Sequence, residues 1–214
     1  MPILILVALM LMIHAPELGA TTAAKLDLDA LTDNASVVAR GKVKSKEARW
    51  DAAKTGIWTR HTVDVSEVAR GDARTTLEFV TRGGVVGKVG QAISGCGSFE
   101  VGDEYVFFLA QDDDKRLQLV GMVQGAFKID GKRAKNSYAG LTLVDAKTLK
   151  ALDKEQSAAL EFDVADLLKR VKDRVKRAEC RVPSPESKSD KATPKVDDPG
   201  PGTRDSEQKA PEKK

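Results

Sequence analysis

The sequence predicts a mainly β protein, built around a small barrel of five or six strands, with a short helix before the barrel and a longer helix packed after it. Two observations predict this class. Between residues 36 and 129, apolar and polar side chains alternate in short segments separated by polar turns, the pattern of half-buried strands. Between residues 163 and 178, apolar residues instead recur at the spacing of one helix face.

A targeting segment precedes the predicted barrel. Residues 3–13 form an unbroken apolar run that is too short for a membrane span, which needs about 20 residues. Pro16 and Gly19 then interrupt the run, and Ala20 is a small residue suited to a signal peptidase. We therefore expect residues 1–20 to be a signal peptide of a protein exported to the periplasm or the medium, with no membrane span left after cleavage. Because no Lys or Arg precedes the run, a misassigned start and a buried N-terminal element stay open.

The elements of the domain follow in order. Residues 21–35 are expected to be a short helical lead-in, with the helix at 26–35. Residues 36–145 are expected to form the barrel, with strands at 36–48, 57–68, 75–82, 105–110, 117–123 and 126–129. The segment 105–110 is apolar on both faces, which indicates a central strand.

A longer helix is predicted in the segment 146–180. Asp163 is placed to cap it, and an apolar stripe follows at Val164, Leu168, Val171, Val175 and Ala178. We expect this helix to pack on the barrel and to close one of its ends.

The last segment, 181–214, is expected to be a disordered tail. It holds six of the eight prolines of the chain and no aromatic residue, so it cannot bury enough apolar surface to offset the entropy of ordering. The tail either keeps the protein soluble or serves as a spacer or a weak contact to a wall polymer.

Long, bent strands joined by short turns favour a closed barrel of the OB type, with a Greek-key barrel or a small sandwich as alternatives. The order of several blocks also resembles a recurring domain of exported bacterial proteins. These blocks are residues 38–43, Trp50-Asp51, Arg70-Gly71-Asp72, Gly83-Gly84, 99–109 and 121–127. The resemblance implies export and an OB-like barrel, but no activity.

The same blocks are similar, more weakly, to the netrin-like OB barrels of tissue inhibitors of metalloproteinases. Those inhibitors present an N-terminal cysteine to the zinc of the protease. Cleavage after Ala20 would leave Thr21 at the N-terminus of this chain, so the inhibitory mechanism does not carry over.

Composition excludes several classes of function. Two histidines and two cysteines are too few for zinc ribbons, iron–sulfur ferredoxins or dense disulfide scaffolds. A net charge of +3 from 35 basic and 32 acidic residues is close to balance and indicates no partner. The glycine-rich segment 83–97 has neither the spacing of a phosphate loop nor a complete dinucleotide fingerprint. We therefore expect no cofactor and no metal site.

Two features are candidates for binding. Four cations lie on one face of the first predicted strand, with two tryptophans nearby: Arg40, Lys42, Lys44, Lys46, Trp50 and Trp58. Charge and stacking together favour an anionic envelope polymer, and the alternative is a solvated face whose lysines discourage edge pairing. Gly83 and Gly84 begin the segment in which a binding loop is most expected.

Three residues suggest other chemistry. Cys96 and Cys180 are expected to form a disulfide in an oxidising compartment, or else to remain two free thiols. His61 has a near-neutral reference pKa and could be a general base, but it shares its strand face with Ile57 and Val63, as a packed histidine would.

Together these features favour an exported, non-enzymatic binding or interaction module, with an exported protein or an anionic envelope polymer as its partner. Export argues against nucleic acid as the ligand. The alternatives are a netrin-like protease inhibitor and a hydrolase that uses His61.

Overall fold

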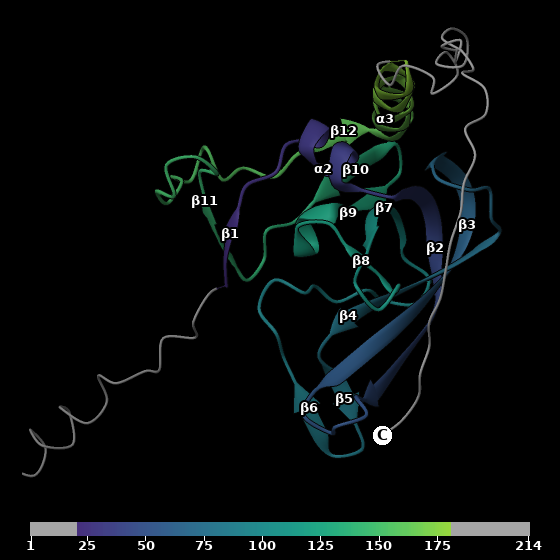
Figure 1. Ribbon diagram of the computed structural model, residues 1–214, viewed down its shortest axis with the longest axis vertical. Coiled ribbons are helices and arrows are strands. Elements are labelled where there is room, and N and C mark those ends of the chain that lie inside the picture. Colours follow the sequence, from purple (N-terminus) through teal and green to yellow (C-terminus); the bar gives the residue numbers. More distant parts are fainter. Residues whose placement is uncertain (1–20, 181–214) are drawn as a thin grey trace, which may run out of the picture. The chain divides into compact units, whose positions relative to one another are not determined.

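The computed structural model describes residues 21–180, so the predicted signal peptide and tail lie outside the described residues. The protein is mainly β, with helices α2 (Leu28–Asn34) and α3 (Val164–Glu179) at one end of the main sheet (Figure 1). This confirms the predicted class. Within residues 21–180, no helix is both long and apolar enough to cross a membrane.

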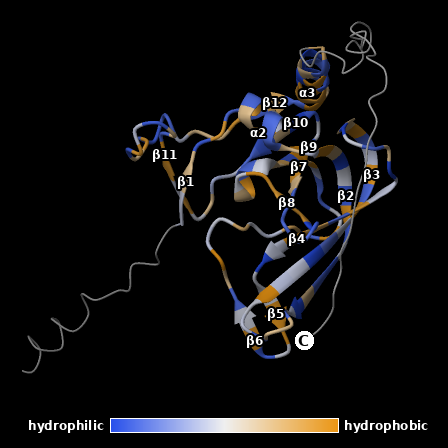
Figure 2. Ribbon diagram, viewed as in Figure 1, coloured by the Kyte–Doolittle hydropathy of each residue, from blue (hydrophilic) through white to orange (hydrophobic). Residues whose placement is uncertain are grey.

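The main sheet is antiparallel and has the strand order β12-β10-β9-β7-β2-β3-β4, with β8 also paired to β7. Its long strands agree with the predicted segments, and their apolar and polar residues alternate along β2 and β3 (Figure 2). The strands are β2 (Val37–Trp50), β3 (Ile57–Arg70), β4 (Thr76–Arg82), β7 (Glu104–Gln111), β8 (Leu117–Leu119), β9 (Ala126–Asp130), β10 (Arg133–Asn136) and β12 (Glu161–Asp163).

Strand β7 lies in the centre of the sheet, as its apolar sequence predicts, and its two faces belong to two different cores. Val106 and Phe108 point toward the helices, into a cluster that we call the helix-side core. Phe107 and Leu109 point the other way, into a cluster with Phe79, Phe99 and their neighbours that we call the pocket-side core. All four of these β7 side chains are fully buried.

Helix α3 begins where the sequence predicts, because the Asp163 carboxylate accepts hydrogen bonds from the backbone N–H groups of Ala165 and Asp166. The helix buries Val164, Leu167, Leu168 and Val171 in the helix-side core, whereas Ala178 of the predicted stripe is exposed. The helix was expected to close an end of the barrel. Helices α3 and α2 instead cover the helix-side face of the sheet, opposite the pocket-side core. The β7 side chains on this face are apolar and have to be buried.

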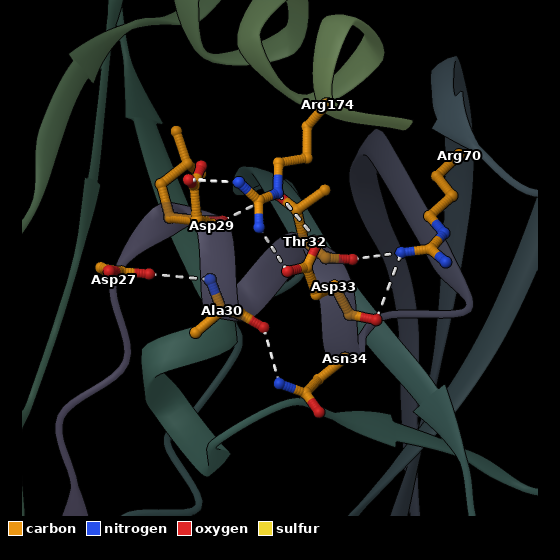
Figure 3. A network of polar contacts seen from close by, with 9 residues as sticks. Asp27, Asp29, Ala30, Thr32, Asp33, Asn34, Arg70 and Arg174 are labelled. Carbon is orange, nitrogen blue, oxygen red and sulfur yellow. Dashed lines mark hydrogen bonds and ion pairs between the residues drawn. The ribbon is translucent and has the colours of Figure 1, made fainter. Parts of the chain in front are cut away.

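An arginine of α3 holds α2 in place (Figure 3). Arg174 donates to both carboxylate oxygens of Asp33, at 2.9 and 2.5 Å, and to Asp29 at 2.5 Å. The hydrogen bond from Arg174 holds the pKa of Asp33 below its ordinary value. On the far side, Arg70 donates to the backbone carbonyls of Thr32 and Asp33. The short helix is thus fixed by charge as well as by packing.

The sheet is not closed into a barrel. Strands β4 and β8 are neighbours in space, but within residues 21–180 no backbone pairing joins them. Strand β8 is also shorter than predicted. A strand was predicted over 117–123, yet β8 ends at Leu119, and Gly121 turns the chain with φ +64° into the 3-10 helix η2 (Met122–Gly125).

Two small sheets complete the fold. Strand β1 (Thr21–Ala24) pairs in parallel with β11 (Leu141–Val144), so part of the predicted helical lead-in is extended. Strand β5 (Gly84–Val86) pairs with β6 (Val89–Gln91) to form a hairpin at the opposite end of the structure from the helices (Figure 1). This hairpin lies on the pocket side.

Candidate functional site

Strand β2 changes face midway, and this change decides which residues form a site. Its register with β3 shifts between Val43 and Ser45, so Lys44 is an extra residue in the ladder. A one-residue bulge reverses the alternation of side chains. Beyond it, Lys46 is the cross-strand neighbour of His61, on the pocket side. The prediction that placed Lys46 on one face with the other three cations is therefore wrong.

Each of the four predicted cations lies beside a carboxylate. Lys42 lies opposite Asp64 on one side and Glu104 on the other. The other three cations form ion pairs: Arg40 with Glu104 at 2.7 Å, Lys44 with Asp64 at 3.1 Å, and Lys46 with Glu100 at 2.7 Å. Interspersed charges of both signs give no strong anion-binding surface.

The two tryptophans lie on opposite faces of the sheet. Trp58 lies opposite Arg49 and is flanked by two guanidiniums, Arg82 at 4.9 Å and Arg116 at 4.7 Å from the ring centroid. Trp50 lies opposite Ile57, on the pocket-side face, and is 38% exposed. The structure therefore does not bring the tryptophans and the cations together into one platform for an anionic polymer.

A pocket of about 590 Å³ lies between the pocket-side face of β2, β3 and β4 and the glycine-rich segment. Gly83 and Gly84 both line it, so this part of the predicted binding site is in contact with a cavity. The side chains that matter most for its chemistry are Lys46, Thr59, His61, Thr81, Cys96 and Phe99.

Gly84 allows the β5–β6 hairpin to approach the sheet. Its φ is +136°, and a Cβ there would lie 2.4 Å from the Thr59 hydroxyl oxygen. Thr59 donates to the carbonyl of Gly83 at 2.6 Å. A side chain at position 84 would therefore push the hairpin away from the pocket.

His61 forms the floor of the pocket. It is only 3% exposed, and its ring stacks on Phe79 with centroids 4.8 Å apart and meets the edge of Phe99 at 5.3 Å. Its Nε2 lies 3.0 Å from the Thr81 hydroxyl, whereas Nδ1 has no hydrogen-bond partner within residues 21–180. Burial, assisted by the charge of Lys46, lowers the pKa of His61 to about 4, so the ring is neutral at physiological pH.

The two cysteines are not bonded to each other in the structure. Cys96 is half-buried in the pocket wall, and Cys180 is exposed at the end of α3, which packs on the other core. The two cysteines lie on elements on different sides of the sheet, and their pairing stays a prediction. Burial raises the pKa of the Cys96 thiol, which disfavours the reactive thiolate.

Sequence reasoning missed Lys46, Thr81 and Phe99 as parts of one site. The sequence held one signal of this site. Thr59 and His61 are polar residues at positions of the otherwise apolar face of β3. Within residues 21–180, no group of three or more possible metal ligands occurs. Comparison of the chain with protein-family models and with curated protein sequences gives no match.

Proposed function

We propose that this chain is an exported, non-enzymatic binding module of the bacterial envelope or medium, and that its ligand site is the pocket over His61. The apolar run at residues 3–13 and the small residue Ala20 support export. The strands around the pocket-side core support a finer description of the fold, an OB-like barrel left open between β4 and β8.

The observation that carries the proposal is the pocket itself, whose lining includes a buried histidine with an unpaired Nδ1. A buried polar group without a partner costs about 1–3 kcal/mol, and a functional role is one of the reasons for which native proteins keep such a group. Here the group belongs to a ring that lines a pocket, and the pocket has the size of small-molecule sites, roughly 300–1,000 Å³.

The same geometry favours binding over hydrolysis. A catalytic triad needs a group that orients the imidazole from Nδ1, and here Nδ1 has no such partner within residues 21–180. The hydroxyl beside Nε2 belongs to Thr81, which is itself 8% exposed. The thiol of Cys96 is held in its protonated form by burial. These arrangements suit recognition better than nucleophilic attack.

The binding role is tested with extracts of small molecules from the envelope and the medium of the native host. Titration of the ¹⁵N-labelled chain with these extracts is expected to shift the amide signals of Gly83, Gly84 and Cys96. Ala92→Trp places a bulky ring at the pocket lining and should abolish the shifts, whereas Ala52→Trp, in an exposed turn outside the pocket, should keep them. If no extract shifts these signals, the proposed function is wrong.

Export is tested separately by the intact mass of the protein isolated from its native host. A chain that begins at Thr21 supports export. An uncleaved chain contradicts it, and ligands of the cytoplasm then become the candidates.

A further inference from the structure

Exposed apolar side chains gather around the β5–β6 hairpin, at the end of the structure away from the helices (Figure 1). Single exposed apolar residues are ordinary, whereas a group of them marks an interaction surface. Within residues 21–180, four of the six large apolar side chains that are exposed belong to this end. We call these four and the partly buried Val86 the hairpin patch: Trp50, Val85, Val86, Val89 and Ile93.

The hairpin is apolar on both of its faces. Val85 lies opposite Gly90 in the hairpin, and Val86 lies opposite Val89. Because successive residues of a strand point to opposite faces, Val85 lies on one face and the pair of Val86 and Val89 on the other. Val85 is 68% exposed and Val89 is 49% exposed. An antiparallel hairpin beside water usually has one polar face, and this hairpin has none.

The base of the hairpin is fixed to the sheet, and its tip projects. The side-chain oxygen of Gln91 accepts a hydrogen bond from the backbone N–H of Ile57 at 2.6 Å, which ties β6 to the start of β3. At the turn, the φ of Gly87 is +61°, and nothing else in the described chain lies within 4 Å of the place where a Cβ would be. A projecting tip that is apolar on both faces suits a medium that surrounds it.

Trp50 lies at the base of the same hairpin. The backbone of Gly84 lies against the side chains of Ala48 and Ile57, and Trp50 is the cross-strand neighbour of Ile57. An indole has an apolar body and one polar N–H group, and tryptophan is enriched where a membrane meets water.

Unpaired lysines flank the patch. Lys54, in the turn between β2 and β3, and Lys88, in the turn of the hairpin, are exposed and form no ion pair within residues 21–180. The two acidic residues at this end are already engaged. Glu47 pairs with Arg49 at 2.7 Å, and Asp51 accepts hydrogen bonds from the backbone and the hydroxyl of Thr55 in its own turn. The charges left without a partner at this end are therefore positive, which complements an anionic surface.

We propose that the hairpin patch docks the protein on an anionic lipid bilayer, with the three valines inserted among the lipids and Lys54 and Lys88 beside the lipid phosphates. A bilayer surrounds the tip and covers both of its faces, whereas the surface of a second protein covers only one. Insertion stays shallow, because each strand of this two-stranded sheet has an unpaired edge whose backbone groups need water. The proposal goes beyond the proposed function and does not depend on the ligand of the pocket.

The first test is flotation of the full chain, in the form isolated from its native host, with two kinds of vesicle. One kind is phosphatidylcholine mixed with phosphatidylglycerol, and the other is phosphatidylcholine alone. We expect binding to the anionic vesicles to be at least about tenfold tighter, because each lysine near an anionic surface favours binding. High salt should reduce this preference.

The decisive variant is Val89→Asp, with Val101→Asp as its matched control. The two valines are similarly exposed, at 49% and 56%, and neither lines the pocket. Val101 lies in the turn before β7, where the N–H of the next residue donates to the carbonyl of Val43, away from the hairpin. We expect Val89→Asp to weaken vesicle binding at least about tenfold and Val101→Asp less than about threefold, since both add the same charge but only Val89 is inserted. Because neither valine is buried, both variants should fold.

The fluorescence of Trp50 locates the contact on the molecule. The chain has two tryptophans, so Trp58→Phe leaves Trp50 as the only one. Anionic vesicles with brominated acyl chains should quench the fluorescence of Trp50 in this variant, and adding Val89→Asp should abolish the quenching.

Several outcomes would overturn the proposal. These are absence of vesicle binding, equal binding to the two kinds of vesicle, equal effects of the two valine variants, and unquenched Trp50. Self-association that Val89→Asp abolishes, found without vesicle binding, would assign the hairpin patch to a second copy of the chain instead. The extract-induced shifts at the pocket are measured without vesicles, so failure of the docking proposal and failure of the proposed function are distinguished.

Discussion

The buried imidazole of His61 should make the stability of the protein depend on pH in a window that contains its two pKa values. In the folded state its pKa is about 4, and in the unfolded chain it returns to its ordinary value of 6.5. As the pH falls below about 6.5, the imidazole binds a proton in the unfolded state. In the folded state it does not bind that proton until the pH approaches about 4. Stability contributed by the neutral ring is therefore lost on acidification.

The size of the effect follows from the two pKa values. Linkage gives a loss of about 2 kcal/mol in the free energy of unfolding between about pH 7.5 and about pH 5, and little further loss below about pH 4, where both states are protonated. The ring is 3% exposed, so solvent screening does not reduce this figure greatly.

The assay is urea unfolding of the wild type and of His61→Phe at several pH values. Phenylalanine keeps an aromatic ring between Phe79 and Phe99 but does not titrate. Carboxylates with lowered pKa values, such as Asp33 and Asp103, destabilise both proteins equally on acidification and cancel in the difference. We expect the wild type to lose about 2 kcal/mol relative to His61→Phe between about pH 7.5 and about pH 5. Parallel curves would refute the assignment of a buried, neutral His61.

Three further predictions concern the fold around the site. Arg174→Gln should lower the free energy of unfolding because it removes the ion pairs between α3 and α2. These ion pairs are exposed to solvent, so the loss should be larger at low salt than at high salt. Urea unfolding at two salt concentrations measures the difference. Gly84→Ala should cost at least about 2 kcal/mol, since φ is +136° and the Cβ site is occupied, whereas Gly87→Ala, with open space around it, should cost about 1 kcal/mol. Without reductant, the exposed Cys180 should react rapidly with a thiol reagent, and the half-buried Cys96 only slowly. If neither thiol reacts until a reductant is added, the two cysteines are bonded to each other.

The long elements could be predicted because each is determined by local sequence. The alternation along β2 and β3, the doubly apolar segment of β7 and the Asp163 cap of α3 all depend on residues close together in the chain. The short elements could not be predicted in this way. Strands β1 and β12 have three or four residues each, and they form because distant partners, β11 and β10, offer unpaired backbone groups.

Part of the candidate site stands out in the sequence, and part does not. Gly83 and Gly84 stand out in the sequence because a run of glycines marks an unusual backbone. The position of Lys46 in the pocket does not stand out in the sequence. It depends on a bulge, and a bulge is set by how two strands align and leaves no local pattern. One shifted residue moved a cation from the outer face to the pocket.

By itself, the sequence determined the mainly β class, the limits of the long strands and of α3, and the shortage of histidines and cysteines. These follow from side-chain periodicity and composition, which need no knowledge of the fold. Only the tertiary structure decided that the sheet stays open, that Cys96 and Cys180 lie apart, and that Lys46 joins His61 over one pocket. Each of these depends on contacts between residues distant in the chain, whose alignment is settled by packing of the two cores against β7.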